Sequence, residues 1–337
     1  MRGGAAFTRV LIMSLWLLFT LVNYAEGKAY DLNNLTAKEA FEKGRLLRAQ
    51  FKNVEGRRYL KFAAELGEPN AAYLYAMELA SYKSTIRTPP ESEHYLMIAA
   101  KNGSRKAMQF LYQHANWLEK EERNLWKKNY YNAVINLGRE QPEQAFYELA
   151  LYHKGSDDEL SQYYLSRAVA FNHPKALMDL ASQVEAGKGT FVLPGSRQTN
   201  ARHTYLKAAE AGYLPAILNY IKYLEGAQMY GKAYEWRVKA MEAGDLTSLP
   251  ILASILIDQS EPYGFVESDF VAAKAYLSVY LESAGRDKLP ALYSNVETLF
   301  SNLSLVVNDT YDNKLIILEN RIKSHAPFYN HDAFWDY

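Results

Sequence analysis

The stretch Lys-Ala-Tyr-Glu-Trp-Arg-Val-Lys-Ala-Met-Glu-Ala-Gly, residues 232–244, decides the fold of this 337-residue chain. It places a large aromatic side chain at Trp236 and small side chains at Ala233 and Ala240, which suits a helix packed tightly on neighbouring helices. Gly244 closes the stretch, and glycine is the residue that most often ends a helix in a left-handed backbone conformation. The stretch therefore predicts a helix that ends at a glycine and is pressed against other helices.

The same features recur along the chain at a regular interval. With the closing glycine as the reference, equivalent positions are separated by 36, 35, 34, 40, 32 and 41 residues, and they fall at Gly67, Gly103, Gly138, Asn172, Gly212, Gly244 and Gly285. Intervals of this size are typical of tetratricopeptide-type repeats, in which each repeat is a pair of helices. Because a single pair cannot bury its own apolar face, the pairs stack into a solenoid.

Two further sets of positions support helix pairs. An aromatic residue stands eight residues before most of the reference positions, at Tyr59, Tyr95, Tyr130, Tyr164 and Trp236. An alanine follows the reference positions, at Ala71, Ala107, Ala145, Ala176 and Ala216. We expect the aromatic rings to wedge between helices and the alanines to let two helix backbones approach closely.

A more specific pattern appears in the later repeats. Leu180-Ala181 is followed by Val184, Gly187 and Gly189, and Tyr152-x-x-Gly155 and Tyr223-x-x-Gly226 share one spacing. Together with Lys-Ala-x-x-Trp-x-x-Lys-Ala at 232–240, these residues resemble the Sel1-like repeat (SLR) family over residues 36–286, although Leu-Ala stands where that family has Leu-Gly. The resemblance implies an all-α, right-handed α-solenoid of about seven SLR/TPR-like helix pairs with C-terminal capping helices.

The first 27 residues have the features of a secretory signal peptide. Arg2 and Arg9 precede an apolar run at 10–22, which is shorter than the ~20 residues of a membrane-spanning helix, and small residues at Ala25 and Gly27 suit cleavage. We therefore expect a signal peptide at 1–27, a repeat solenoid at 28–286, capping helices at 287–324 and an aromatic tail at 325–337 that folds back on the cap. No integral membrane span is expected after cleavage.

The amino-acid composition limits the cellular compartment and the classes of binding partner that we expect. The chain has no cysteine, which excludes disulfides and thiolate chemistry. Since large exported eukaryotic proteins usually carry disulfides, we expect a bacterial periplasmic protein. Without residues 1–27 the chain keeps 36 basic and 37 acidic residues, so it indicates neither nucleic-acid binding nor a polybasic membrane surface.

No pattern typical of a catalytic, cofactor or metal site is found in the sequence. The seven histidines lack the spacing that places two ligands on one helical face. Gly187-Lys188-Gly189-Thr190 lacks the earlier glycine of a phosphate-binding loop and follows a helix, so we expect a repeat turn there. One metal alternative stays open and ranks below a solvated tail: a curled tail with His325, His331, Asp332 and Asp336.

Binding of another protein is the function that this fold class suggests, because stacked helix pairs form a long curved surface. The family resemblance implies a non-enzymatic adaptor or scaffold in the bacterial envelope. A first alternative that it implies is a periplasmic immunity protein, which binds and neutralises a lipase toxin of type VI secretion. A second alternative is a carrier domain of an envelope hydrolase. The partner would be an envelope component or a secreted toxin.

The expected binding face follows from helical periodicity. In the tetratricopeptide pattern, positions +3, +6, +10 and +13 after each reference position point to the concave side of the solenoid. In the repeat with the stretched turn, these positions are counted with Ala145 as +4. We expect the partner to contact Asn70, Tyr73, Met77, Lys106, Gln109, Gln113, Tyr147, Met178 and Lys222. The alternative is that Tyr73, Tyr147 and Met178 pack between neighbouring repeats, as aromatic residues at repeat interfaces often do.

We predict that the mature protein begins between Glu26 and Lys28, because the apolar run is too short to anchor the chain and small residues follow it. Amino-terminal sequencing of the protein recovered from cells tests this prediction. Recovery of a chain that keeps residues 1–25 in a membrane fraction would contradict it.

Overall fold

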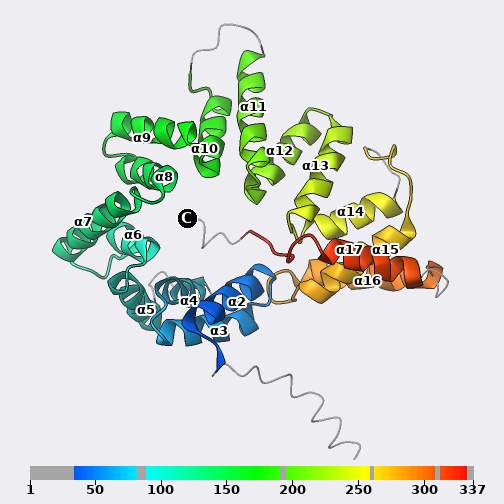
Figure 1. Cartoon of the computed structure of the whole chain (residues 1–337), viewed down its shortest axis with the longest axis horizontal. Coiled ribbons are helices and arrows are strands. Elements are labelled where there is room, and N and C mark those ends of the chain that lie inside the picture. The colour runs from blue at the N-terminus through cyan, green and yellow to red at the C-terminus, as the bar shows by residue number, and fades with distance from the viewer. Residues whose placement is uncertain (1–33, 82–88, 190–194, 259–261, 308–311, 332–337) are drawn as a thin grey trace, which may run out of the picture. The chain divides into compact units, whose positions relative to one another are not determined.

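The computed structural model describes residues 34–81, 89–189, 195–258, 262–307 and 312–331 (Figure 1). The chain divides into two compact units, residues 1–36 and 37–337, and the expected signal peptide lies outside the described residues. The described part of the second unit contains sixteen α-helices and no β-strand. These helices are α2 (Ala37–Ala49), α3 (Asn53–Glu65), α4 (Pro69–Ser81), α5 (Pro90–Lys101), α6 (Arg105–His114), α7 (Lys120–Leu137), α8 (Pro142–His153), α9 (Asp158–Ala170), α10 (Pro174–Glu185), α11 (Ser196–Glu210), α12 (Leu214–Gly226), α13 (Tyr230–Glu242), α14 (Ser248–Ile257), α15 (Phe270–Ser283), α16 (Pro290–Val306) and α17 (Asp312–Lys323).

Consecutive helices pack on each other as pairs. Contacts are most extensive between α2 and α3, α8 and α9, α10 and α11, and α4 and α5, and the series continues through α14 and α15. Seven pairs therefore run from α2 to α15, and α16 and α17 both pack on α15. The predicted all-α solenoid of helix pairs with two further C-terminal helices is confirmed. In the described part of the chain, no helix is both long and apolar enough to cross a membrane.

At five of the reference positions, the helix ends in a residue with a left-handed backbone, as expected. Each of these residues has a positive φ: Gly67 (89°), Gly103 (100°), Asn172 (59°), Gly212 (79°) and Gly244 (92°). The hydrogen bonds around Gly103 show the reason, since its N–H donates to the Ala100 carbonyl and the Ser104 N–H donates to the Ala99 carbonyl. This paired closure of the last turn needs a left-handed residue, which favours glycine or asparagine.

The two other reference positions also follow the ends of helices, Gly138 after α7 and Gly285 after α15, but neither has a left-handed backbone. Gly138 keeps helical backbone angles (φ −60°, ψ −13°), and the chain turns over the next residues before α8 begins. Gly285 does not end a helix in a left-handed conformation, and it is constrained instead by a contact with the first repeat.

The aromatic residues and alanines that we expected at helix–helix contacts are found there. Tyr59 and Tyr130 are buried, and Tyr75 meets Tyr95 edge to face with 4.7 Å between the ring centroids. The alanines that allow close approach of the helices are buried, at Ala63, Ala71, Ala99, Ala107, Ala145, Ala176, Ala208, Ala216 and Ala240. Aromatic wedges and small residues therefore account for the contacts between successive pairs.

The first and last parts of the second unit meet at Phe51, in the turn between α2 and α3. Its side chain is 1% exposed and lies in the core formed by α13 to α17. The Phe51 carbonyl accepts a hydrogen bond from the Asp287 N–H (3.2 Å), and the Gln50 carbonyl accepts one from the Gly285 N–H (2.8 Å). A β-carbon at Gly285 would lie 2.6 Å from the Phe51 carbonyl oxygen, so this approach requires glycine. The first helix pair is therefore docked on the last.

The segment 325–331, which we call the strap, makes a second connection. The Tyr329 N–H donates to the Gly244 carbonyl (2.9 Å), and the Leu246 N–H donates to the Tyr329 carbonyl (2.9 Å). The next N–H, that of Asn330, donates to the Ala49 carbonyl at the end of α2 (2.7 Å). The strap therefore ties the first helix to the turn between α13 and α14.

The structure defines the ends of the helix array. The first helix, α2, forms a pair with α3. After α10, the next helix, α11, begins at Ser196. The tail was expected to fold back on the cap; Phe328 does lie in the core that includes α16 and α17, whereas the residues after it contact α2 and the α13–α14 turn.

We predict that Gly244→Ala destabilises the protein more than Gly212→Ala. Both glycines have left-handed backbones, for which a side chain costs about 1–2 kcal/mol. A β-carbon at Gly212 would meet no atom within 4 Å, whereas one at Gly244 would lie 2.7 Å from the Pro327 carbonyl oxygen in the strap. Denaturant unfolding of the two variants measures the difference, and equal losses would show that the strap does not hold this position.

Candidate protein-binding face

Every second helix lies along the inner side of the curved array. Figure 1 shows α6, α8 and α10 on this side, with α5, α7 and α9 outside them. We call the side formed by α4, α6, α8, α10 and α12 the inner face. The expected contact residues all belong to these five helices.

A cavity of about 450 Å³ opens where α4, α6 and α8 meet. Both apolar and polar residues line it, and none of the lining residues is acidic. The lining residues are Tyr73, Met77, Lys106, Gln109, Phe110, Gln113, His114, Leu151 and Lys154. We call this the inner-face cavity.

Five of the nine expected contact residues line this cavity. They are Tyr73, Met77, Lys106, Gln109 and Gln113. Gln113 is exposed, whereas Met77, Lys106 and Gln109 are half-buried. Tyr73 is only 4% exposed, so most of its ring packs in the core, as the alternative interpretation expected. The helical register therefore brings this part of the predicted stripe together.

Asn70 and Tyr147 make polar contacts elsewhere on the inner face. The Asn70 side-chain oxygen lies 3.5 Å from the Ser104 hydroxyl, which also caps the start of α6. The Tyr147 hydroxyl donates to an Asp179 carboxylate oxygen (3.1 Å), and its ring stacks on His173 with 4.6 Å between centroids. Tyr147 therefore links α8 to α10 and does not line the cavity.

Met178 and Lys222 also lie outside the cavity. Met178 is half-buried and packs against the core between α10 and α13, as the alternative interpretation expected. Lys222 is exposed on α12, several repeats from the cavity. The structure therefore does not bring these two residues together with the other five.

Four lining residues are not among the nine expected contacts: Phe110, His114, Leu151 and Lys154. The Phe110 ring packs against the His114 ring with 5.3 Å between centroids, and together they form part of the cavity wall. Leu151 occupies the same stripe as Tyr147, one turn later, so its position was a usable signal. An apolar residue there is easily assigned to the core instead.

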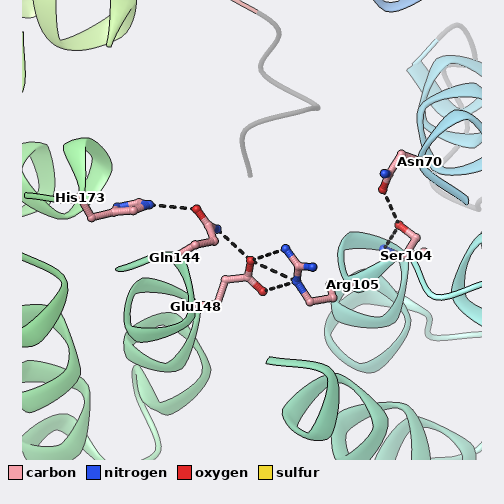
Figure 2. Close-up of polar contacts among 7 residues, drawn as sticks. Asn70, Ser104, Arg105, Gln144, Glu148 and His173 are labelled. Atoms are coloured by element: carbon pink, nitrogen blue, oxygen red, sulfur yellow. Dashed lines mark hydrogen bonds and ion pairs between the residues drawn. The ribbon is translucent and has the colours of Figure 1, made fainter. Parts of the chain in front are cut away.

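A chain of polar contacts joins α6, α8 and α10 beside the cavity (Figure 2). Arg105 donates three hydrogen bonds to Glu148, from Nε to Oε2 (3.0 Å) and to Oε1 (3.3 Å) and from Nη2 to Oε1 (3.1 Å). The Gln144 amide donates to Glu148 Oε1 (2.8 Å), and its oxygen lies 2.9 Å from His173 Nε2. We call these four residues the inner-face polar chain. Paired, charge-assisted contacts of this kind fix the spacing between successive repeats.

The position of His173 determines its protonation state. Its Nδ1 accepts a hydrogen bond from the Ala176 N–H at the start of α10 (3.3 Å), so the ring proton must lie on Nε2, which donates to Gln144. Burial lowers the pKa of His173 from 6.5 to about 4, and the nearby charge of Lys175 contributes in the same direction. The imidazole is therefore neutral at pH 7 and acts as a helix cap.

The described residues include no cluster of three or more His, Cys, Asp or Glu side chains that could hold a metal ion. Of the tail ligands considered from the sequence, His325 lies beside the Arg321 carbonyl (2.9 Å), and His331 meets Tyr213 edge to face. Asp332 and Asp336 lie outside the described residues.

No protein-family model and no curated protein matches this chain. Among solved structures, it is similar to a protective antigen with an SLR fold from uropathogenic Escherichia coli, at 16% identity and a TM-score of 0.39, over 87% of this chain and 62% of that one. It is also similar to a Sel1 repeat protein from Oxalobacter formigenes (20% identity, 86% and 89% of the two chains, TM-score 0.38). A third similar structure is an immunity protein from Pseudomonas aeruginosa (17% identity, 71% and 82%, TM-score 0.39).

The chain therefore spans 62% of the length of the first of these proteins. The first two are SLR proteins by name, which is the family that the sequence resembles. These similarities do not enter the assignment of the repeats. That assignment rests on the pairing of consecutive helices and on the left-handed residues at the helix ends.

We predict that His173 makes the protein less stable as the pH falls from 6.5 to about 4. The unfolded chain takes up the proton first, because the folded pKa is the lower of the two, and above pH 6.5 the effect is absent. At about 1.4 kcal/mol per pKa unit, the loss reaches as much as about 3 kcal/mol.

The test compares unfolding free energies of the wild type and His173→Asn across this range, since asparagine can also cap a helix but does not titrate. His203→Asn is the matched control, because His203 is exposed on α11. A wild-type pH profile that His173→Asn leaves unchanged would show that the ring does not titrate as described.

Proposed function

We propose that this protein is a protein-binding module and that the inner-face cavity receives a segment of its partner. The observation that carries the proposal is the convergence of three consecutive inner helices, α4, α6 and α8, on one open cavity. An extended protein segment lying along the inner face would contact side chains from successive repeats, which is how solenoids present their binding surfaces.

The chemistry of the cavity supports an acidic segment with an apolar side chain. Lys106, Lys154 and His114 stand among the lining residues, and no lining residue carries a carboxylate. Met77 and Phe110 offer apolar surface, and methionine adapts its shape to different partner side chains. Charge complementarity of this kind favours fast and selective association.

The proposal extends to two finer roles and to a location. We place the protein in the bacterial periplasm on the basis of residues 1–27, as an adaptor in the envelope. The alternative role is that of an immunity protein whose partner is a secreted lipase toxin. An activity assay of the partner separates these roles, because an immunity protein blocks catalysis by its partner in an equimolar complex, whereas an adaptor leaves it unchanged. We propose no enzymatic activity; a catalytic turnover of the purified protein itself would favour the hydrolase-carrier alternative.

We predict that Gln109→Trp, which fills the cavity, and Lys106→Glu, which reverses its charge, each weaken partner binding at least about tenfold, equivalent to about 1.4 kcal/mol. The partner is the protein that the wild-type chain captures from an envelope extract. Calorimetry with the purified partner then measures the affinities.

Ile251→Trp is the matched control. Ile251 is an exposed residue that lines a different cavity of about 460 Å³ next to α14, outside the inner face. This variant should bind as the wild type does, and thermal melting should confirm that all three variants stay folded. Loss of binding with Ile251→Trp, and normal binding with the other two, would move the site away from the inner face.

A further inference from the structure

The face formed by α14, the turn at 262–266 and the start of α16 contains a hollow of about 460 Å³, which we call the α14 cavity. It is lined by Thr247, Pro250, Ile251, Ser254, Ile255, Asp258, Pro262, Tyr263 and Leu292. Among these lining residues only Asp258 is charged, and five are aliphatic or proline. A cavity of roughly 150 Å³ with apolar walls is enough to hold a benzene ring. The α14 cavity is therefore large enough to receive an aromatic side chain together with part of its backbone.

An exposed aromatic ring stands next to the α14 cavity. Phe265 is 57% exposed, and its ring centroid lies 6.1 Å from that of the lining residue Tyr263. The Phe265 ring does not line the cavity of its own chain. Ile251 and Leu289, which are 40% and 39% exposed, add apolar surface on α14 and at the start of α16. This face therefore carries both an apolar ring in solvent and an apolar hollow beside it.

The turn that carries Phe265 is anchored on both sides. The Tyr263 hydroxyl donates to Glu225 Oε1 (2.6 Å), which also accepts a hydrogen bond from Arg237 Nη2 (2.9 Å). The Val266 N–H donates to the Tyr263 carbonyl (2.9 Å), and Val266 packs against the core formed by α13 to α17. A side chain on a backbone that is already fixed loses little conformational freedom on binding, which favours association.

Opposite charges flank the α14 cavity on different walls. Glu267 is exposed two residues after Phe265, and Lys288 is exposed four residues before the lining residue Leu292 of α16. Among the residues that the structure describes, neither Glu267 nor Lys288 forms an ion pair. The face therefore has an acidic rim on the side of the ring and a basic rim on the side of α16.

We propose that two copies of this chain associate through this face, with the Phe265 ring of each copy in the α14 cavity of the other. A two-fold axis makes every contact reciprocal, which requires a surface that carries both a projection and the hollow that fits it. The same rotation brings Glu267 of each copy toward Lys288 of the other, so the rim charges are complementary. The inference is independent of the proposed function, because no residue of the α14 cavity lines the inner-face cavity.

Sedimentation velocity of the full-length chain, from low to high micromolar concentration, tests the inference. We expect the mass to rise from that of one chain toward that of two. Phe265→Asp, which removes the ring, and Ile251→Trp, which fills the hollow, should each weaken dimerisation at least about tenfold. The matched control is Tyr163→Asp, since Tyr163 on α9 is 55% exposed and lies outside this face. This variant should dimerise as the wild type does.

A mixture of the two monomeric variants tests whether the contacts are reciprocal. In a mixed pair, the Phe265 ring of the Ile251→Trp copy meets the unfilled cavity of the Phe265→Asp copy. One of the two contacts is then intact, whereas neither variant alone can form any. The mixture should therefore associate more tightly than either variant by itself. A mixture that associates no better than its components would refute the reciprocal arrangement.

The rim charges are tested by reversing them. Glu267→Lys or Lys288→Glu alone should weaken dimerisation about twofold to fivefold, the usual range for an exposed ion pair. Both changes in one chain should restore the wild-type affinity, because each reversed charge then meets a reversed charge in the other copy. Failure of the double variant to recover would contradict the pairing of these two rims.

Two further outcomes overturn the inference. One is a wild type that stays monomeric over the whole concentration range, which leaves the α14 cavity to a segment of another protein. The other is a dimer that Tyr163→Asp weakens as strongly as Phe265→Asp does, which places the contact elsewhere. Thermal melting shows whether each variant stays folded. If Ile251→Trp lowers stability, Phe265→Asp still decides, because its side chain lines no part of the cavity.

Discussion

The insertion of Phe51 into the core of the last helices is the contact on which the rest of the second unit depends. A helix pair at the end of a solenoid normally leaves an apolar face without a neighbour. Here the turn after α2 fills a core built by α13 to α17, and Gly285 lets the two backbones approach. Since the strap ties the same two regions together, the terminal repeats cover each other's apolar surface.

The repeat architecture could be predicted because its signals are local. A helix that ends in a left-handed residue needs glycine or asparagine whatever surrounds it, so Gly103 and Gly212 were identified from spacing alone. Gly285 has the same spacing and a different reason, a close approach to Phe51 across the chain. Sequence spacing cannot separate these two causes. It also gave no sign that the turn after α2 packs in the core of α13 to α17, because that contact joins residues far apart in the sequence.

The candidate site could be predicted in part. Helical periodicity places Lys106, Gln109 and Gln113 on one stripe, and the structure finds all three around one cavity. Phe110 and Leu151 were missed because an apolar residue on a helix is assigned to the core unless its neighbours are known. The contact between Arg105 and Glu148 was missed because it depends on how two repeats are set against each other, which no single helix encodes.

The docking of the first pair on the last also limits how such a chain can evolve. Open solenoids gain or lose repeats by duplication and deletion, because each repeat contacts only its neighbours. In this chain, adding or removing one helix pair would carry Phe51 away from the core that receives it and would separate the strap from Ala49. The number of repeats is therefore held constant by geometry, and sequence change is confined to substitutions and to loops that lie away from the contact.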